Sequence, residues 1–376
     1  MRSLTTEVAI VGGGLVGCSA ALFLRRHGVP AVVIEAARCG SKASGVNYGG
    51  VRRQGRALDQ MPMAMRAHAI WQDIRALVGT DGEYVRSGHL KLARTPADLA
   101  ELEKYKALTH AFDLDLQILG PAQLARSHGW LADSIAGASL CPDDGNANPR
   151  LISPAFAWAA REAGAVILEE APVAHAARDG DAFVLRCADQ EVRARHVINA
   201  AGAWAGRFAA LFGEPVPMST IHPQMLVTEA VPGFMSVSLG MQGGGIYARQ
   251  VSRGNVVLGG GRTESGPTDL ARPARANMAA LLERAAEVIP ALAGVHVIRF
   301  WSGVEGKLPD GNPVIGPSTT TPGLYHAFGL CGAGFQVGPA IGEALADLIV
   351  RGRARFSLEP FRLERFVASP PGHHSA

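Results

Sequence analysis

The stretch between residues 7 and 35 constrains the fold more than any other part of the chain. Its first apolar run, Val8–Val11, is rich in β-branched residues, which is typical of a buried parallel strand. Three glycines follow, and Leu15–His27 then repeats apolar residues at helical spacing, with Gly28 where a helix C-cap favours positive φ. Ala31–Ile34 is a second apolar strand. This order predicts a βαβ unit.

Glycines in the turn of this unit fit the spacing G-x-G-x-x-G at Gly12, Gly14 and Gly17. The first permits a tight turn, the second lets a pyrophosphate approach the backbone, and the third lets helix and strand pack closely. Glu35, about twenty residues further on, stands where an acid accepts hydrogen bonds from ribose hydroxyls. Because strand, helix and acid are all present, we favour a dinucleotide site over a structural glycine-rich turn.

Composition limits the other classes of protein. The chain has 376 residues, enough for two domains, and a formal net charge of +3 without dense Lys/Arg runs, which argues against a nucleic-acid partner. No run of eighteen apolar residues predicts a membrane span, and the strand that begins close to Met1 leaves no room for a signal peptide. The five cysteines are scattered without a C-x-x-C, so we expect no metal cage and a reduced, cytoplasmic protein.

The loop after Glu35 is rich in Gly, Ser and Arg and is expected to lie close to the cofactor. Its candidate donors to phosphates or a ring system are Ser44, Gly45, Asn47, Gly49 and Gly50. Arg52 follows these glycines directly, and we expect it to be functional, whereas Arg53 and Arg56 are expected to be solvated basic residues. Further on, Asp143 and Asp144 lie in a Pro/Gly/Asn-rich segment and are expected to cap a turn rather than bind metal.

The remaining pattern predicts two domains in an α/β fold, a Rossmann-like cofactor domain with an inserted antiparallel α+β substrate domain. We expect residues 1–80, 140–215 and 300–370 in the first, 81–139 and 216–299 in the second, and a disordered tail at 371–376. Expected helices are 58–78, 96–112, 118–128, 151–163 and 273–288. Expected strands are 84–93, 165–169, 183–187, 192–194, 197–201, 224–228, 245–250, 255–259 and 324–327, and a glycine-rich turn and a helix follow the last strand.

Five segments in order resemble the D-amino-acid oxidase family of flavoproteins, which includes glycine oxidase, sarcosine oxidase and amine dehydrogenase subunits. They are the N-terminal fingerprint, SGVNYGGVR, VINAAGAW, PDGNPVIGP and CGAGFQVGPAIGE. The resemblance implies FAD, and oxidation of a C–N bond of an amino or secondary amino acid by hydride transfer to the flavin. It implies an ADP site at Gly12, Gly14, Leu15, Val16, Gly17, Glu35 and Ala36, with Val173 near the adenine. It also implies nucleotide or flavin contacts at Ala201, Gly202, Trp204, Gly303, Gly332, Ala333, Gly334, Phe335 and Gln336, besides the loop donors named above.

Two positions depart from the sarcosine oxidase pattern. Gly303 stands where some members attach the flavin through Cys, so we expect FAD to be non-covalent. Gln336 stands where those enzymes tend to have Lys, which leaves Arg52 as the expected partner of the substrate carboxylate through two parallel N–H donors. Tyr247 and His222 are further candidates for substrate contacts, and Trp301 is expected in the core.

Three alternatives remain open at this stage. The chain resembles catalytic subunits of opine, hydroxyproline and related amine dehydrogenases, which work beside a smaller redox subunit; a homo-oligomer is also possible. A flavin-binding protein of tRNA modification or assembly shares this N-terminus, since fold does not fix chemistry. An NAD-dependent enzyme would need a second G-x-G-x-x-G unit, which we do not find. The substrate, and whether the enzyme is an oxidase or a dehydrogenase, are not specified by the sequence.

Overall fold

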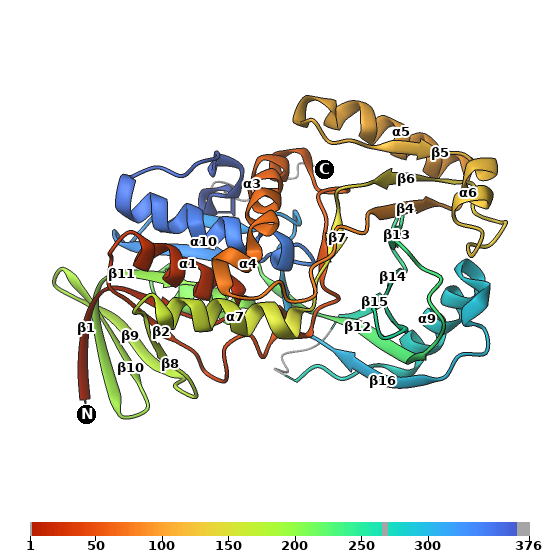
Figure 1. Cartoon of the computed structure of the whole chain (residues 1–376). Coiled ribbons are helices and arrows are strands. Elements are labelled where there is room, and N and C mark those ends of the chain that lie inside the picture. Colours follow the sequence, from red (N-terminus) through yellow and green to blue (C-terminus); the bar gives the residue numbers. More distant parts are fainter. Residues whose placement is uncertain (1, 265–269, 367–376) are drawn as a thin grey trace, which may run out of the picture.

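The computed structural model describes residues 2–264 and 270–366, so the tail expected at 371–376 lies outside the described residues. The described chain is built on two large sheets and a two-stranded ribbon, β3 (Gly50–Val51) with β7 (Gly145–Asn146). Figure 1 shows the sheets side by side, with β7 and its flanking loops between them. The expected α/β fold with a Rossmann-like part and a second, largely antiparallel part is confirmed.

The first sheet has the order β18-β19-β11-β1-β2-β8. Its parallel strands are β19 (Leu324–Phe328), β11 (Gln190–Asn199), β1 (Arg2–Val11), β2 (Ala31–Ile34) and β8 (Val166–Leu168). β18 (Val314–Pro317) joins antiparallel, and a ribbon of β9 (Val173–Asp179) and β10 (Ala182–Cys187) joins β11.

Both faces of this sheet are buried. Val8 and Ile10 pack under the helices α1 (Leu15–Arg26), α3 (Met61–Gln72), α7 (Pro149–Glu162) and α10 (Gly334–Arg351). Ala9 and Val11, which alternate with them, pack instead against the β9–β10 ribbon and α8 (Ala205–Ala210). This two-sided burial is why the parallel strands are uninterrupted apolar runs in the sequence.

The second sheet has the order β16-β12-β15-β14-β13-β4-β6-β5, with β17 paired to β12. It is antiparallel apart from the β4–β13 pair, and α9 (Arg275–Val288) covers one face. Its strands are β4 (His89–Ala93), β5 (Gln117–Leu119), β6 (Gly137–Cys141), β12 (Ser219–Ala230), β13 (Ser238–Met241), β14 (Tyr247–Gln250), β15 (Asn255–Glu264), β16 (Val297–Ser302) and β17 (Glu305–Lys307). Helices α2 (Ala43–Val46), α4 (Ile74–Val78), α5 (Pro96–Thr109) and α6 (Pro121–Ser127) complete the described regular helices.

Three expected elements differ from the structure in an informative way. The strands expected at 192–194 and 197–201 are one strand, β11, because its first half pairs with both β10 and the early part of β1. The helix expected at 58–78 is divided into a 3₁₀ turn, α3 and α4, since the chain leaves helical geometry at Asp73. Its stop at Gly79, φ +81°, follows the usual glycine C-cap.

Candidate active site

The carboxyl edge of the first sheet collects the polar loops. Gly12 N donates to Ile34 O at 2.9 Å, and Ala200 N donates to Val11 O at 2.9 Å, so the segments that follow β1, β2 and β11 leave the sheet together. The order of strands changes direction at β1, which lies between β2 and β11. Ligands of open α/β sheets bind at this kind of switch point, beyond the carboxyl ends of the strands.

The glycines of the first turn have the local geometry that a phosphate-binding turn requires. Gly12 has φ +109°, and an added Cβ would lie 2.3 Å from Ala200 O. An added Cβ at Gly17 would lie 2.0 Å from Gly12 O, so this glycine lets α1 pack on the turn. At Gly14 an added Cβ meets only Ser44 Oγ, at 3.1 Å, which leaves the N-terminus of α1 approachable from outside. Leu15 and Val16 form the buried first turn of this helix.

Glu35 is held at the end of β2 with its carboxylate turned toward the glycine turn. Its Oε2 accepts a hydrogen bond from Gly13 N at 2.6 Å. Its Oε1 accepts one from Ala37 N at 2.8 Å, so that Ala36 lies between the two residues that this second bond joins. Ala171 N donates to Glu35 O at 2.9 Å, so the chain that leads into Val173 and β9 passes beside this acid. The structure thus brings together the positions assigned to the ribose and the adenine.

The loop after β2 folds over the start of α1. Ser44 Oγ accepts from Leu15 N at 2.9 Å, and buried Gly45 lies beside it in α2. Both Nδ2 bonds of Asn47 go to carbonyls of α2, and its Oδ1 accepts from Gly49 N, so we assign this side chain to shaping the loop. Gly49 has φ +90°, and an added Cβ would lie 2.1 Å from Ala147 O, after which Gly50 enters β3.

Two further loops border the same edge of the sheet. After β11, Ala201 leads into Gly202 and Trp204, and Lys42 Nζ lies 5.9 Å from the centre of the Trp204 ring. After β19, Gly332 precedes Ala333, the N-cap of α10, and Gly334, its first residue. Gly202 and Gly332 both have positive φ, and no described atom lies within 4 Å of a Cβ added to either, so their backbones face open space.

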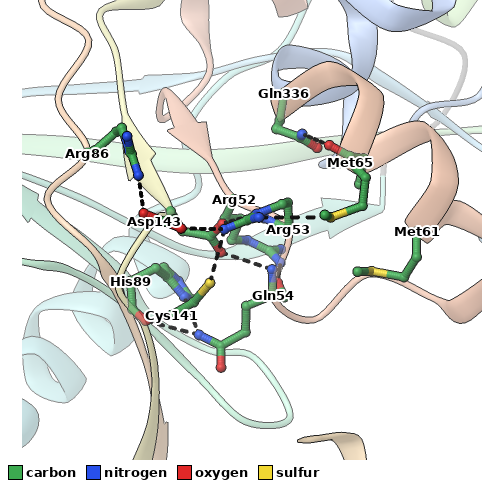
Figure 2. Close-up of polar contacts among 12 residues, drawn as sticks. Arg52, Arg53, Gln54, Met61, Met65, Arg86, His89, Cys141, Asp143 and Gln336 are labelled. Carbon is green, nitrogen blue, oxygen red and sulfur yellow. Dashed lines mark hydrogen bonds and ion pairs between the residues drawn. The ribbon is translucent and has the colours of Figure 1, made fainter. Parts of the chain in front are cut away.

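The side chains that begin α10 point away from this open space. Phe335 packs on Trp71 with ring centres 5.1 Å apart, and Gln336 Nε2 donates to Ala64 O at 2.9 Å (Figure 2). A cofactor bound at this turn would therefore meet its backbone and not these side chains. Glu305 on β17, which the sequence did not single out, accepts from Gly332 N at 3.0 Å, and burial raises the pKa of its carboxyl group.

One face of the second sheet lies against the loops at the carboxyl edge of the first sheet. Pairing in register aligns Trp301, Met225, Gly259 and Tyr247 across β16, β12, β15 and β14. Trp301 Nε1 donates to Val46 O at 2.7 Å, so this half-buried tryptophan joins the sheet to the loop instead of filling a core. Gly303 lies beside it, with an added Cβ 3.1 Å from Val46 Cγ2.

Tyr247 lies on this face with its ring over Gly259 and against Tyr48. The two tyrosine rings meet edge-on with centres 4.8 Å apart, and Tyr48 Oη is a buried atom without a hydrogen-bond partner among the described residues. Burial raises the pKa of both phenols, and the charge of Arg52 acts in the opposite direction on both, so its guanidinium lies near the pair.

His222 is buried on β12, but alternation places it on the other face. Side chains alternate along a strand, so His222 lies on the same face of β12 as Leu226, which packs in the core under α9. Met225 lies on the opposite face, where it pairs with Trp301. We therefore leave His222 out of the proposed substrate contacts.

The expectation that Arg53 and Arg56 are solvated is wrong. The two residues are 4% and 6% exposed, because the chain between β3 and the 3₁₀ turn runs inward against β4 and β6. Arg53 Nε lies 3.1 Å from Asp144 Oδ1, and Asp144 also accepts from Arg53 N and Gln54 N, both at 2.9 Å. Asp144 is therefore a buried anchor for this loop rather than a simple turn cap. Figure 2 shows Arg53 and Gln54 reaching Cys141 and His89 of the second sheet.

Together, the glycine turn, the acid at the end of β2 and the loops around them define a dinucleotide-binding oxidoreductase fold with a second sheet facing the cofactor loops. The FAD-dependent oxidoreductase family model matches residues 7–348, and the chain belongs to this family. It is an FAD-dependent oxidoreductase, so the NAD alternative and the assembly-protein alternative are set aside. The open backbone at Gly14, Gly202 and Gly332 fits such a cofactor.

Similar proteins cover nearly all of the chain. A glycine oxidase of Geobacillus kaustophilus is 29% identical over 96% of this chain and 97% of its own. An opine oxidase subunit of Rhizobium meliloti is 27% identical over 96% and 98%. The crystal structure of L-proline dehydrogenase from P. horikoshii superposes with a TM-score of 0.91 at 26% identity, over 98% and 99% of the two chains.

Residues 2–264 and 270–366 contain no helix long and apolar enough to cross a membrane, and no cluster of three or more His, Cys, Asp or Glu side chains arranged to hold a metal. All five cysteines are free thiols, and four of them are buried.

Proposed function

We propose that this enzyme oxidises the C–N bond of an amino acid or a secondary amino acid. The observation that carries the proposal is the grouping of Arg52, Tyr48 and Tyr247 where the second sheet faces the cofactor loops. A guanidinium binds a carboxylate through two parallel N–H donors, and phenol hydroxyls offer hydrogen bonds to a neutral amine. Relatives named as a glycine oxidase, an opine oxidase subunit and a sarcosine dehydrogenase support an amino acid or N-substituted amino acid as substrate.

The ADP half of the cofactor is assigned to the first βαβ unit. We propose that the α1 N-terminus at Gly14 and Leu15 takes the pyrophosphate, that Glu35 accepts from the ribose, and that Val173 lies near the adenine. The loops around Gly50, Ala201 and Gly332 are assigned to the flavin half. When bound, FAD supplies the acceptor for the two electrons and the hydride of the substrate.

The protein's own part in the reaction is binding and orientation. Arg52 would hold the carboxylate, and Tyr247 would fix the amine or α-carbon beneath it, with the Tyr48 ring limiting access of water from the loop side. No strong base is required when the amine enters neutral. Glu305, whose pKa is raised by burial, lies close enough to Tyr247 to raise the pKa of that phenol as well.

A partner chain is a second possibility, favoured by the full-length similarity to a protein named as one subunit of an opine oxidase. If a partner passes the electrons on, the isolated chain will be reduced by substrate but reoxidised slowly in air. If the chain is an oxidase, reoxidation will be fast and will produce hydrogen peroxide.

The test is anaerobic mixing of the purified yellow protein with a panel of D-amino, N-methyl, N-carboxyalkyl and cyclic imino acids, followed by admission of air. Bleaching of the flavin band by at least one member supports the proposal. A protein that retains FAD but is bleached by none of them, while dithionite still bleaches it, contradicts the proposed substrate class. We expect acid or heat to release FAD intact, because Gly303 offers no thiol for a covalent bond.

A further inference from the structure

Two cationic side chains meet at Gly55, beside the proposed site, and a third cationic residue follows Gly55 directly in the chain. We call Arg52, Arg56 and Lys91 the cation cluster. An added Cβ on Gly55 would lie 3.0 Å from Lys91 Nζ and 3.2 Å from Arg52 Nη1, so the two charged groups reach the same point from opposite elements. Arg56 follows Gly55 directly. Burial has the largest part in lowering the pKa of His89, and the charges of Arg52, Lys91 and Arg56 lower it further.

The cluster lacks anions of its own. Asp144, the buried carboxylate beside it, already bonds Arg53 Nε and two backbone N–H groups. In the part of the chain that the structure describes, no ion pair joins a carboxylate to any member of the cluster. Arg56 is 6% exposed, and its Nε is a buried donor without a hydrogen-bond partner among the described residues.

The pKa shifts of Arg56 and Lys91 follow from burial and from this excess of positive charge. Burial, and next the charge of Arg52, lower the pKa of Arg56 to about 9 and that of Lys91 to about 8. Buried charge without a partner is costly, and proteins retain it mainly where a ligand supplies the opposite charge.

The cluster lies on the same face of the second sheet as Tyr247. Tyr247 pairs with Gly240 on β13, and Gly240 pairs with Lys91 on β4, so the three positions form one row across the strands. Leu90 and Leu92, on either side of Lys91, are fully buried in the core on the opposite face. A Cβ added at Gly240 would lie 3.2 Å from His89 Nε2, so the buried imidazole of His89 lies beside the middle of this row.

We propose that the cation cluster binds a second carboxylate, so that the substrate is a dicarboxylic amino acid or secondary amino acid. Arg52 takes the carboxylate next to the reacting carbon, and Arg56 with Lys91 takes the other. A substrate with one carboxylate would leave two of the three cations uncompensated. This inference rests on the proposed function and narrows its substrate class.

The experiment uses the FAD-loaded enzyme and two inert acids, glutarate and butyrate, which is glutarate with one carboxylate replaced by hydrogen. Each is titrated against the flavin absorption band to obtain Kd, for wild type, Lys91→Met, Lys91→Arg, Arg56→Met and the control Lys104→Met, whose side chain is 67% exposed on α5. We expect glutarate to bind wild type about tenfold or more tightly than butyrate, and Lys91→Met and Arg56→Met to remove most of this preference. Lys91→Arg should retain part of it, and Lys104→Met all of it.

A second readout separates binding from folding. Because Lys91→Met removes an unpaired charge, we expect its thermal midpoint without ligand to equal or exceed that of wild type, and glutarate to raise the midpoint of wild type more than that of the variant. Equal affinity for the two acids in wild type overturns the inference. A Lys91→Met variant that keeps the glutarate preference also overturns it. If the only change in Lys91→Met is weaker addition of sulfite to the flavin, the inference fails as well, because the cations would then act on the cofactor and not on a second carboxylate.

Turnover distinguishes this inference from the proposed function. If no amine in the panel bleaches the flavin, the proposed function fails whatever glutarate does. If amino acids with one carboxylate match their dicarboxylic analogues in kcat/KM, the proposed function stands and the dicarboxylate inference fails.

Discussion

Arg53 and Asp144 form a buried ion pair, with Nε 3.1 Å from Oδ1, that joins the loop after β3 to the turn between β6 and β7. The same carboxylate accepts from the backbone N–H groups of Arg53 and Gln54. The pair therefore fixes the path of the chain on both sides of Arg53, and Arg52 Nη1 donates to the carbonyl of Gln54 within this fixed loop. The charge of Asp144 also acts on Arg52 and Arg56, but in the described part of the chain it forms an ion pair with neither, so the guanidinium of Arg52 is available for a substrate.

Breaking this pair should destabilise the protein strongly. We expect Arg53→Met to lower the free energy of unfolding by about 3–5 kcal/mol, because it leaves Asp144 buried without its charged partner. Denaturant unfolding of the holoenzyme measures the change, and Arg186→Met is the control, since its pair with Glu191 is exposed and should contribute about 0–1 kcal/mol. Equal losses for the two variants would show that the buried pair has no special role.

Replacing Arg52 should affect substrate binding more than stability. We expect Arg52→Ala to keep FAD but to weaken binding of an acidic substrate by about 2–4 kcal/mol, the effect of removing a buried charge-assisted pair. Arg52→Lys should recover part of this, because an ammonium group lacks the planar fork. Steady-state kinetics with the best substrate and its amide measure the effect. A loss of the same size for acid and amide would place the carboxylate elsewhere.

Enlarging Gly14 should remove the cofactor. The first atom added at this position already lies 3.1 Å from Ser44 Oγ, so Gly14→Val would fill the approach to the α1 N-terminus. We expect protein with little FAD and a lower thermal midpoint, because the bound cofactor stabilises the fold by mass action. Gly233→Val is the control, since an added Cβ there meets no described atom within 4 Å. Normal flavin content in Gly14→Val would move the phosphates away from this turn.

Glu214 should make stability depend on acid pH. Although burial raises the pKa of this carboxyl group, hydrogen bonds from His326, Ser318 and Thr319 outweigh burial and bring the pKa down from 4.5 to about 2. The unfolded chain therefore takes up the proton first as pH falls, so the contribution of Glu214 to stability is complete above about pH 4.5 and is lost toward pH 2.

The measurement is the unfolding free energy across this range of pH. Glu214→Gln should be less stable at pH 7, by about 3 kcal/mol, which is the linkage equivalent of lowering the pKa from 4.5 to about 2, and should show a shallower dependence on pH. Glu101→Gln, at an exposed position on α5, should keep the slope of wild type. An unchanged slope in Glu214→Gln would assign the acid sensitivity to other carboxylates.

The sequence alone determined the first βαβ unit, because every signal in it is local. Gly12, Gly14 and Gly17 lie within six residues of each other, and an uninterrupted apolar run before the turn and helical spacing after it indicate burial on each side. The family resemblance then supplied the cofactor and the reaction class, both of which the similar proteins confirm.

Only the tertiary structure showed which other cations lie beside Arg52. In the sequence, the glycines before Arg52 single it out, whereas Arg53 and Arg56 have the pattern of solvated loop residues and Lys91 is a lysine between two leucines of a short strand. Among the described residues, Arg53 forms an ion pair with a carboxylate and the other three cations do not. This difference depends on Asp144, which lies 91 residues from Arg53 along the chain. Contacts across such distances depend on how strands pair and loops pack, and a local pattern of residue types does not encode the partner that a buried charge will find.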